Sequence, residues 1–147
     1  GGQPDLTLQQ VTEAAKLTHA HNFIVKLFNG YETVLTGQSD SLDVGQRFRL
    51  SLARAIARNP ALLIIEEPDG TLDEDTKTLL ADAYDRICRE RTVIFLPRRM
   101  STIRRTDQIV VLHEGKVAAI GPHSRLVTQS PVYRHWEYVN FNEYRHD

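Results

Sequence analysis

Four consecutive apolar residues, Leu62 to Ile65, stand between Pro60 and Pro68 and end directly in two carboxylates, Glu66 and Glu67. A short, unbroken apolar run of this kind is typical of a strand that is buried on both faces, as in a parallel sheet. The prolines bound the run, because proline cannot donate to a strand ladder. This segment therefore predicts a buried strand that ends in acidic side chains.

The rest of the chain alternates between helical and extended apolar spacing. Thr7 and Gln10 form a capping box, and Asp73 suits the start of a later helix. The predicted elements are, in chain order, a helix from Thr7, a helix over 46–58, the strand over 62–65, a helix from Asp73 to about Glu90, a strand over 92–96, a hairpin over 108–120, and two short helices after Pro122, with Val132, Trp136 and Val139 as packing anchors. Strands alternating with helices predict an α/β fold with a partly parallel sheet, preceded by a helical section.

Composition excludes several classes of protein. The 147 residues carry 18 Lys and Arg against 19 Asp and Glu, so the net charge of −1 argues against a nucleic-acid partner and a polybasic membrane surface. The single cysteine, Cys88, cannot form an internal disulfide, which favours a reducing compartment. The apolar runs are too short to span a bilayer.

The pair Glu66-Glu67 is the first candidate for chemistry. Acidic side chains at the carboxyl end of a buried parallel strand face the crevice where α/β proteins bind ligands. One carboxylate there can hold Mg²⁺, and the next can orient or deprotonate a water. Taken alone, the pair is also compatible with a strand whose exit is merely acidic.

The second candidate is the stretch Leu42-Asp-Val-Gly45-Gln46, which opens the helix over 46–58. A glycine before a helix N-terminus offers N–H groups and a positive dipole that suit a phosphate. In isolation, a simple loop-to-helix transition is the more ordinary interpretation.

In combination these segments resemble the ATP-binding cassette (ABC) ATPases of the exporter type, over nearly the whole chain. The segment from Gln46 to Pro60 is similar to the helix that follows the family's signature, and Pro4 to Phe23 is similar to its helical subdomain. Further matches follow in the same order, namely Arg91-Thr-Val-Ile, Met100-Ser-Thr-Ile103, Asp107-Gln-Ile-Val-Val-Leu112, Glu114-Gly-Lys116 and Ile120-Gly-Pro-His123. The resemblance implies a partial P-loop NTPase-type (ABC ATPase) fold, with the helical subdomain and the C-terminal part of the parallel-sheet core.

The departures from the family pattern fall on its chemical positions. The signature Leu-Ser-Gly-Gly-Gln reads Leu42-Asp43-Val44-Gly45-Gln46, so Asp43 brings a negative charge instead of a hydroxyl donor. Glu66 replaces the Walker B aspartate, whereas Glu67 keeps the identity of the family's catalytic base. Gly70-Thr71 replaces Ser-Ala in the D-loop, ahead of Leu72-Asp73. Arg98 stands at the switch histidine, where it cannot exchange a proton near neutrality but could clamp a phosphate or remain solvated.

The four lysines decide what the chain lacks. None of Lys16, Lys26, Lys77 and Lys116 belongs to the Gly-x-x-x-x-Gly-Lys-Ser/Thr loop that cradles the phosphates of ATP. The resemblance places that loop in the family's N-terminal part, before the point where this sequence begins. We therefore expect this chain to be the later half of a nucleotide-binding domain. By itself it should neither bind ATP tightly nor hydrolyse it.

The resemblance implies three regions and a set of roles. The regions are 4–60, the signature subdomain; 61–130, the C-terminal part of the catalytic core; and 131–147, a helical tail. Glu67 is expected as the water-orienting base, Arg98 at the switch position and Glu66 as the magnesium-side carboxylate. The positions expected to contact nucleotide are Leu42, Asp43, Val44, Gly45, Gln46 and Asp73.

Cofactors and partners are implied for the full-length assembly. They are ATP and Mg²⁺, a second nucleotide-binding domain, and transmembrane domains that hold the protein at the cytoplasmic face of the cell membrane. A second hypothesis, motivated by the substituted signature, Walker B and switch positions, is a non-catalytic ABC-fold module with a regulatory or interaction role. Exposed strand edges and an uncovered apolar sheet face are also expected if the P-loop strand is absent, and would promote self-association.

Overall fold

The computed structural model describes residues 5–37 and 41–141. The chain divides into two compact units, Gly1–Leu96 and Pro97–Asp147. The three regions expected from the family pattern, 4–60, 61–130 and 131–147, remain a prediction, and residues 4, 38–40 and 142–147 within them lie outside the described part.

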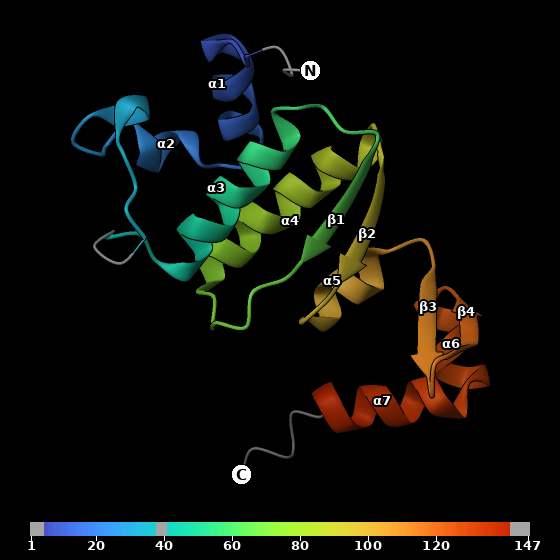
Figure 1. Cartoon of the computed structure of the whole chain (residues 1–147). Helices are drawn as coiled ribbons and strands as arrows, with labels where there is room; N and C mark the ends of the chain where they lie inside the picture. The colour runs from blue at the N-terminus through green and yellow to red at the C-terminus, as the bar shows by residue number, and fades with distance from the viewer. Residues whose placement is uncertain (1–4, 38–40, 142–147) are drawn as a thin grey trace. The chain divides into compact units, whose positions relative to one another are not determined.

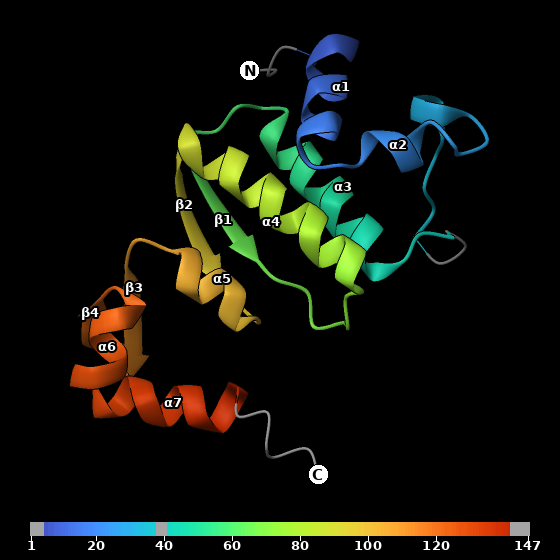
Figure 2. The same cartoon turned by 180° about the vertical axis from the view of Figure 1, so that it is seen from behind.

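The first unit combines helices with a parallel strand pair. Its elements are α1 (Leu8–Leu17), α2 (His21–Ile24), the short 3-10 helix η1 (Gly30–Glu32), α3 (Val44–Ile56), β1 (Leu62–Glu66), α4 (Glu74–Arg89) and β2 (Thr92–Leu96). Helix α4 lies along the β1–β2 pair, α3 lies beside α4, and α1 packs on α3 (Figure 1). The same arrangement is seen from behind in Figure 2. The predicted α/β architecture, with a helical section first, is confirmed.

Helix α1 begins where the capping box predicts. The Thr7 hydroxyl accepts from the Gln10 N–H at 3.1 Å, and the Gln10 side chain accepts from the Thr7 N–H at 2.8 Å. Two N–H groups that have no partner inside the helix are thereby satisfied. The helix then buries Ala14 and Ala15 against the rest of the unit.

Strands β1 and β2 pair in parallel, with Leu62 opposite Thr92 and Glu66 opposite Leu96. One face of the pair is buried, because Leu63 and Ile65 pack against α4 in the main core. The other face is exposed, where four side chains are between 47% and 62% accessible: Leu62, Ile64, Ile94 and Leu96. The expectation of a strand buried on both faces is therefore met on one face only, since among the described residues of the first unit nothing covers the second face.

The second unit is built on the predicted hairpin. It contains α5 (Met100–Arg105), β3 (Ile109–His113), β4 (Lys116–Gly121), α6 (His123–Gln129) and α7 (Pro131–Phe141). Strands β3 and β4 are antiparallel, and the turn residues Glu114 and Gly115 both have positive φ, 51° and 75°. Two successive positive φ values match the right-handed twist of the strands, which explains the tight turn.

The core of the second unit differs from expectation in its aromatic anchor. Tyr133 is fully buried, and its hydroxyl lies 2.7 Å from the His123 Nδ1. Val132 packs at the edge of this core, but Trp136 and Val139 are 37% and 44% exposed. The prediction of Val139 as an anchor is wrong, because the helix turns the Tyr133 side of α7 toward β3 and α6. Trp136 packs against aromatic rings of its own helix, with centroids 6.1 Å from Tyr133 and 5.2 Å from Phe141.

Among the residues described, no helix is both long and apolar enough to cross a bilayer.

Candidate functional site

The two carboxylates that end β1 lie on opposite faces of the strand pair. Glu66 is exposed and continues the face of Leu62 and Ile64, whereas Glu67 is 3% exposed and continues the face of Leu63 and Ile65. This separation follows from the strand period of two, which sends neighbouring side chains in opposite directions. The expectation that both carboxylates face one crevice is therefore not met in this structure.

Glu67 is held from two sides by its own unit. Its N–H donates to the Leu96 carbonyl at 3.1 Å, which extends the parallel ladder by one residue. Its Oε2 accepts from the Tyr84 hydroxyl at 3.0 Å. Tyr84 comes from the middle of α4 and was not singled out by sequence reasoning, since a tyrosine at an inward helical position is indistinguishable from an ordinary core residue.

The signature-like turn opens α3 with an anionic cap. Asp43 accepts from the Gln46 N–H at 2.8 Å, and the Gln46 side chain accepts from the Asp43 N–H at 3.0 Å. The carboxylate thus lies at the end of the helix where a phosphate would otherwise be attracted. In this structure the turn is poorly suited to a phosphate, because a negative charge stands at the helix start and the Gln46 N–H is already engaged by it.

Helix α4 has the same kind of start. Asp73 accepts from the Thr76 N–H at 2.7 Å, and this backbone bond, followed by the Thr76 side chain and the charge of Arg49, lowers the pKa of the Asp73 carboxyl. The D-loop aspartate is therefore a helix cap in this chain.

Two glycines allow a close approach of the α3 turn to its neighbours, which are Gly70 after β1 and Thr76 in the first turn of α4. A Cβ on Gly45 would lie 2.6 Å from the Thr76 Cγ2, and a Cβ on Gly70 would lie 2.9 Å from the Val44 Cγ1. Val44 and Gly70, two departures from the family pattern, are therefore in close contact with each other. Leu42 is buried at the foot of the same turn.

A buried arginine that sequence reasoning missed connects this turn to the helical section. Arg49 is 8% exposed, donates to the Gly45 carbonyl at 3.3 Å and to the His19 carbonyl at 2.7 Å, and stacks over the Phe23 ring at 5.2 Å. Burial lowers the pKa of Arg49, and the charges of Asp43 and Asp73 oppose that shift. Arginine suits the position because its rigid guanidinium reaches two acceptors at once.

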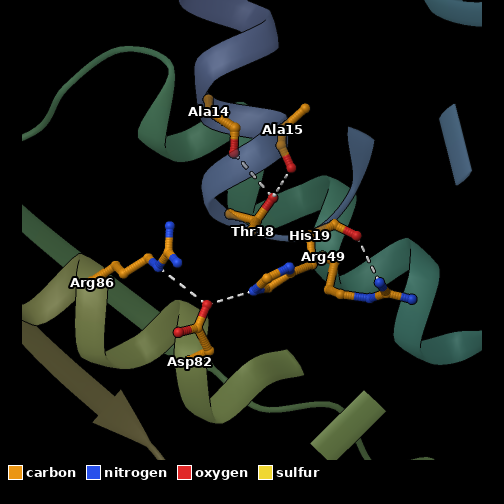
Figure 3. A network of polar contacts seen from close by, with 7 residues as sticks. All are labelled: Ala14, Ala15, Thr18, His19, Arg49, Asp82 and Arg86. Carbon is orange, nitrogen blue, oxygen red and sulfur yellow. Dashed lines mark hydrogen bonds and ion pairs between the residues drawn. The ribbon is translucent and has the colours of Figure 1, made fainter. Parts of the chain in front are cut away.

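The same network continues through a histidine to α4 (Figure 3). His19 has a left-handed backbone, with φ of 60°, and its Nε2 lies 2.6 Å from the Asp82 Oδ2. Arg86 approaches the same oxygen at 3.1 Å. The hydrogen bond from His19, followed by the charge of Arg86, lowers the pKa of Asp82. Sequence spacing gave no signal for this contact, since His19 and Asp82 are 63 residues apart.

Arg98 is exposed and lies between the end of β2 and the start of α5. It belongs to the second unit, whereas Glu66, Glu67 and the α3 turn belong to the first.

Glu66 is the residue that could hold a divalent cation. Its exposed carboxylate at the carboxyl end of β1 suits Mg²⁺, which takes one or two carboxylates and completes its shell with water and phosphate oxygens. Within residues 5–37 and 41–141, no group of three or more His, Cys, Asp or Glu side chains is arranged to hold a metal ion.

The sequence was also compared with those of known proteins. No family model matches the chain. It is 38% identical over 134 residues to a putative multidrug export ATP-binding/permease protein of Bacillus subtilis, covering 91% of this chain. It is 37% identical over 142 residues, or 97% of this chain, to the ATP-dependent lipid A-core flippase of Chromohalobacter salexigens. It is 38% identical over 128 residues, or 87% of this chain, to ABC transporter B family member 1 of Arabidopsis thaliana.

The chain spans 23%, 24% and 10% of the lengths of these three relatives, respectively.

Proposed function

We propose that this chain, whose homologues over about nine-tenths of its length are ATP-binding/permease proteins of ABC transporters, forms the later part of a nucleotide-binding domain in an exporter. The observation that carries this proposal is the similarity along nearly the whole chain to ATP-binding/permease proteins, together with a parallel strand that ends in two carboxylates. In the complete protein, ATP binding and hydrolysis would drive transport.

The proposed roles follow the matched positions. Glu66 would hold Mg²⁺ through its exposed carboxylate, and the cation would supply charge neutralisation for the phosphates. Glu67 would orient the attacking water, and Arg98 would stand at the switch position. The turn Leu42–Gln46 and Asp73 would face nucleotide held by a second domain. The anionic cap by Asp43 favours a weakened contact there.

The proposed partners are a second nucleotide-binding domain and transmembrane domains. They would hold the protein at the cytoplasmic face of the membrane. The chain itself contains no Gly-x-x-x-x-Gly-Lys-Ser/Thr sequence, so a partner segment would have to supply the phosphate-cradling loop.

A second candidate function is a non-catalytic ABC-fold module. Two observations favour it: the Asp43 carboxylate occupies the helix start, and Glu67 is turned into the core. Such a module would use the fold for association or regulation and would not turn over ATP.

Steady-state ATP hydrolysis by the complete protein, alone and with its partner, separates the two candidates. For an ATPase, we expect turnover in the native protein and at least a hundredfold loss in Glu67→Gln, which keeps the size of the side chain but removes its basicity. The matched control is Glu90→Gln, an exposed glutamate after α4. Absent turnover would favour the non-catalytic module, whereas turnover that is equal in Glu67→Gln would contradict the proposed role of Glu67.

A calorimetric titration of the 147-residue chain with Mg-ATP tests the weak-site expectation directly. We expect no binding in the micromolar range, because the α3 turn carries its own carboxylate. Micromolar affinity would contradict this part of the proposal.

A further inference from the structure

Glu67 carries a buried carboxylate, whereas its role in the proposed function requires that carboxylate to contact water. Its side chain is 3% exposed in a structure in which the opposite face of the same strand pair is open to solvent. The Glu67 side chain continues the face of Leu63 and Ile65, which is the α4 side of the strand pair. A carboxylate that takes a proton from water must come within hydrogen-bond reach of that water.

The Glu67 carboxylate is hydrogen-bonded to the side chain of Tyr84. Its hydroxyl donates to the Glu67 Oε2 at 3.0 Å, and its ring is 1% exposed. The ring meets Phe95 of β2 edge to face, with the centroids 4.9 Å apart and an interplanar angle of 65°. The hydroxyl is consequently fixed in place by packing, and it does not depend on a flexible surface side chain.

The backbone around Glu67 is fixed as well. The bond from the Glu67 N–H to the Leu96 carbonyl continues the β1–β2 register, and that register sends the side chain toward α4. Turning the carboxylate outward therefore requires a side-chain rotation that breaks the bond to Tyr84. Hydrogen bonds to a charged group in a buried site are among the stronger ones in proteins.

We propose that Tyr84 is a positioning residue that holds the Glu67 carboxylate turned into the core, and that Glu67 reaches water only after the bond to the Tyr84 hydroxyl is released. This inference rests on the proposed role of Glu67 and deepens it. Tyr84 contacts neither nucleotide nor metal in this scheme; it acts through Glu67 alone. It would keep the ATPase slow until assembly of the complete site draws the carboxylate outward.

Chemical labelling of the 147-residue chain tests the inward state without any nucleotide. A water-soluble carbodiimide with an amine nucleophile labels accessible carboxylates, and tandem mass spectrometry separates Glu67 from its neighbour Glu66. Glu66 is exposed and serves as the internal standard. In the native chain we expect Glu67 to react at least about tenfold more slowly than Glu66. In Tyr84→Phe, which keeps the ring and removes the hydroxyl, we expect the labelling rate of Glu67 relative to that of Glu66 to rise about tenfold.

The matched control is Tyr133→Phe. Tyr133 is also fully buried and also uses its hydroxyl, toward His123, but it belongs to the second unit. It should leave the labelling ratio unchanged, and far-UV circular dichroism verifies that both variants are folded. Equal labelling of Glu66 and Glu67 in the native chain, or an unchanged ratio in a folded Tyr84→Phe chain, would overturn the proposal.

Hydrolysis by the complete protein supplies a second measurement. We expect Tyr84→Phe to raise kcat several-fold with an unchanged KM for ATP, and Tyr84→Phe combined with Glu67→Gln to be inactive. An unchanged or lower kcat in Tyr84→Phe, beside a normal loss in Glu67→Gln, overturns the role of Tyr84 and leaves the proposed function intact. If Glu67→Gln itself keeps full activity, the proposed role of Glu67 in hydrolysis fails, and the labelling result still decides whether Tyr84 holds Glu67.

Discussion

Arg49 is the residue on which the packing between α3 and the helical section depends most directly. Its guanidinium donates to the carbonyls of Gly45 and His19 from a position that is 8% exposed. Removing the guanidinium takes away the donor to the His19 carbonyl, and a part-buried acceptor that is left unpaired costs more than the hydrogen bond itself contributes.

We predict that Arg49→Lys lowers the free energy of unfolding by roughly 1–3 kcal/mol, because an ammonium group cannot reach both carbonyls in the geometry of a guanidinium. Urea unfolding followed by far-UV circular dichroism measures the loss. Arg54→Lys, on the exposed side of the same helix, is the control and should stay within about 0.5 kcal/mol of the native chain. Equal stability of the two variants would show that the contacts of Arg49 are dispensable.

The ion pairs of Asp82 predict that the stability of the chain depends on pH. The hydrogen bond from His19 and the charge of Arg86 lower the pKa of its carboxyl in the folded chain. A lowered pKa in the folded state means that the unfolded chain binds the proton more tightly, so the stabilisation is present above the unfolded pKa of about 4 and is lost as the pH falls through the folded value.

Asp82→Asn should therefore have a lower Tm than the native chain at pH 6, and the difference should shrink below about pH 4. Thermal unfolding between pH 6 and pH 3 gives both curves. The same change at Asp107, an exposed aspartate of the second unit, is the comparison. A Tm difference for Asp82→Asn that stays constant across this range would contradict the assignment of the shift to the ionised carboxylate.

Sequence reasoning found the polar residues that precede helices and missed those that act inside the core. Thr7 and Asp73 stand directly before periodic segments, where a cap has a local signal. Asp43 was expected to contact nucleotide, ahead of a helix from Gln46, but it caps α3, which begins at Val44. Arg49 and Tyr84 have no such signal, because their partners are brought to them by tertiary packing. Glu67 was found by its motif, but its direction depends on strand alternation and on α4, which the motif does not specify.

At the scale of elements, the close approach of α3 to α4 depends on a residue without a side chain. Gly45 lies in the first turn of α3, and a Cβ there would meet the Thr76 Cγ2 at 2.6 Å and the Thr76 Oγ1 at 3.1 Å. Thr76 is buried and lies in the first turn of α4, where Asp73 accepts from its N–H.

The contact between Gly45 and Thr76 predicts that Gly45→Ala changes the free energy of unfolding in the direction opposite to the usual effect of Gly→Ala in a helix. In an unstrained helix, Gly→Ala stabilises by about 1 kcal/mol, but we expect Gly45→Ala to destabilise the chain by roughly 1–3 kcal/mol through overpacking. Thr76→Ser removes the methyl group and keeps the hydroxyl, so the double variant should recover part of the loss. Urea unfolding of the four proteins in this cycle measures the coupling. Stabilisation by Gly45→Ala would show that α3 and α4 are not in close contact there.

The elements themselves were largely predictable, and their burial was not. The parallel pair, the hairpin with its Glu114-Gly115 turn and the two last helices were all expected from spacing and turn chemistry. The apolar run of β1 was expected to be covered on both faces, since apolar spacing records what a strand packs against in its complete fold. In the described part of the first unit, one face only is covered.

At the scale of the whole molecule, the uncovered face of β1 and β2 is the feature with the largest consequence. Four apolar side chains, Leu62, Ile64, Ile94 and Leu96, stand side by side on it, each about half exposed. Within the described residues, β1 and β2 pair only with each other, so each also leaves one strand edge without a ladder partner. Exposed apolar faces and open edges both promote association between chains.

We predict that the isolated chain self-associates through this face. Sedimentation velocity should show the average mass rising with concentration, and Ile64→Lys combined with Ile94→Lys should shift the chain toward the monomer, because each lysine places a charge on the apolar face. Phe28→Lys is the control, since Phe28 is 98% exposed but lies far along the chain from both strands. If the native chain stays monomeric at high concentration, or if Phe28→Lys disperses it equally well, the strand face is not the surface that associates.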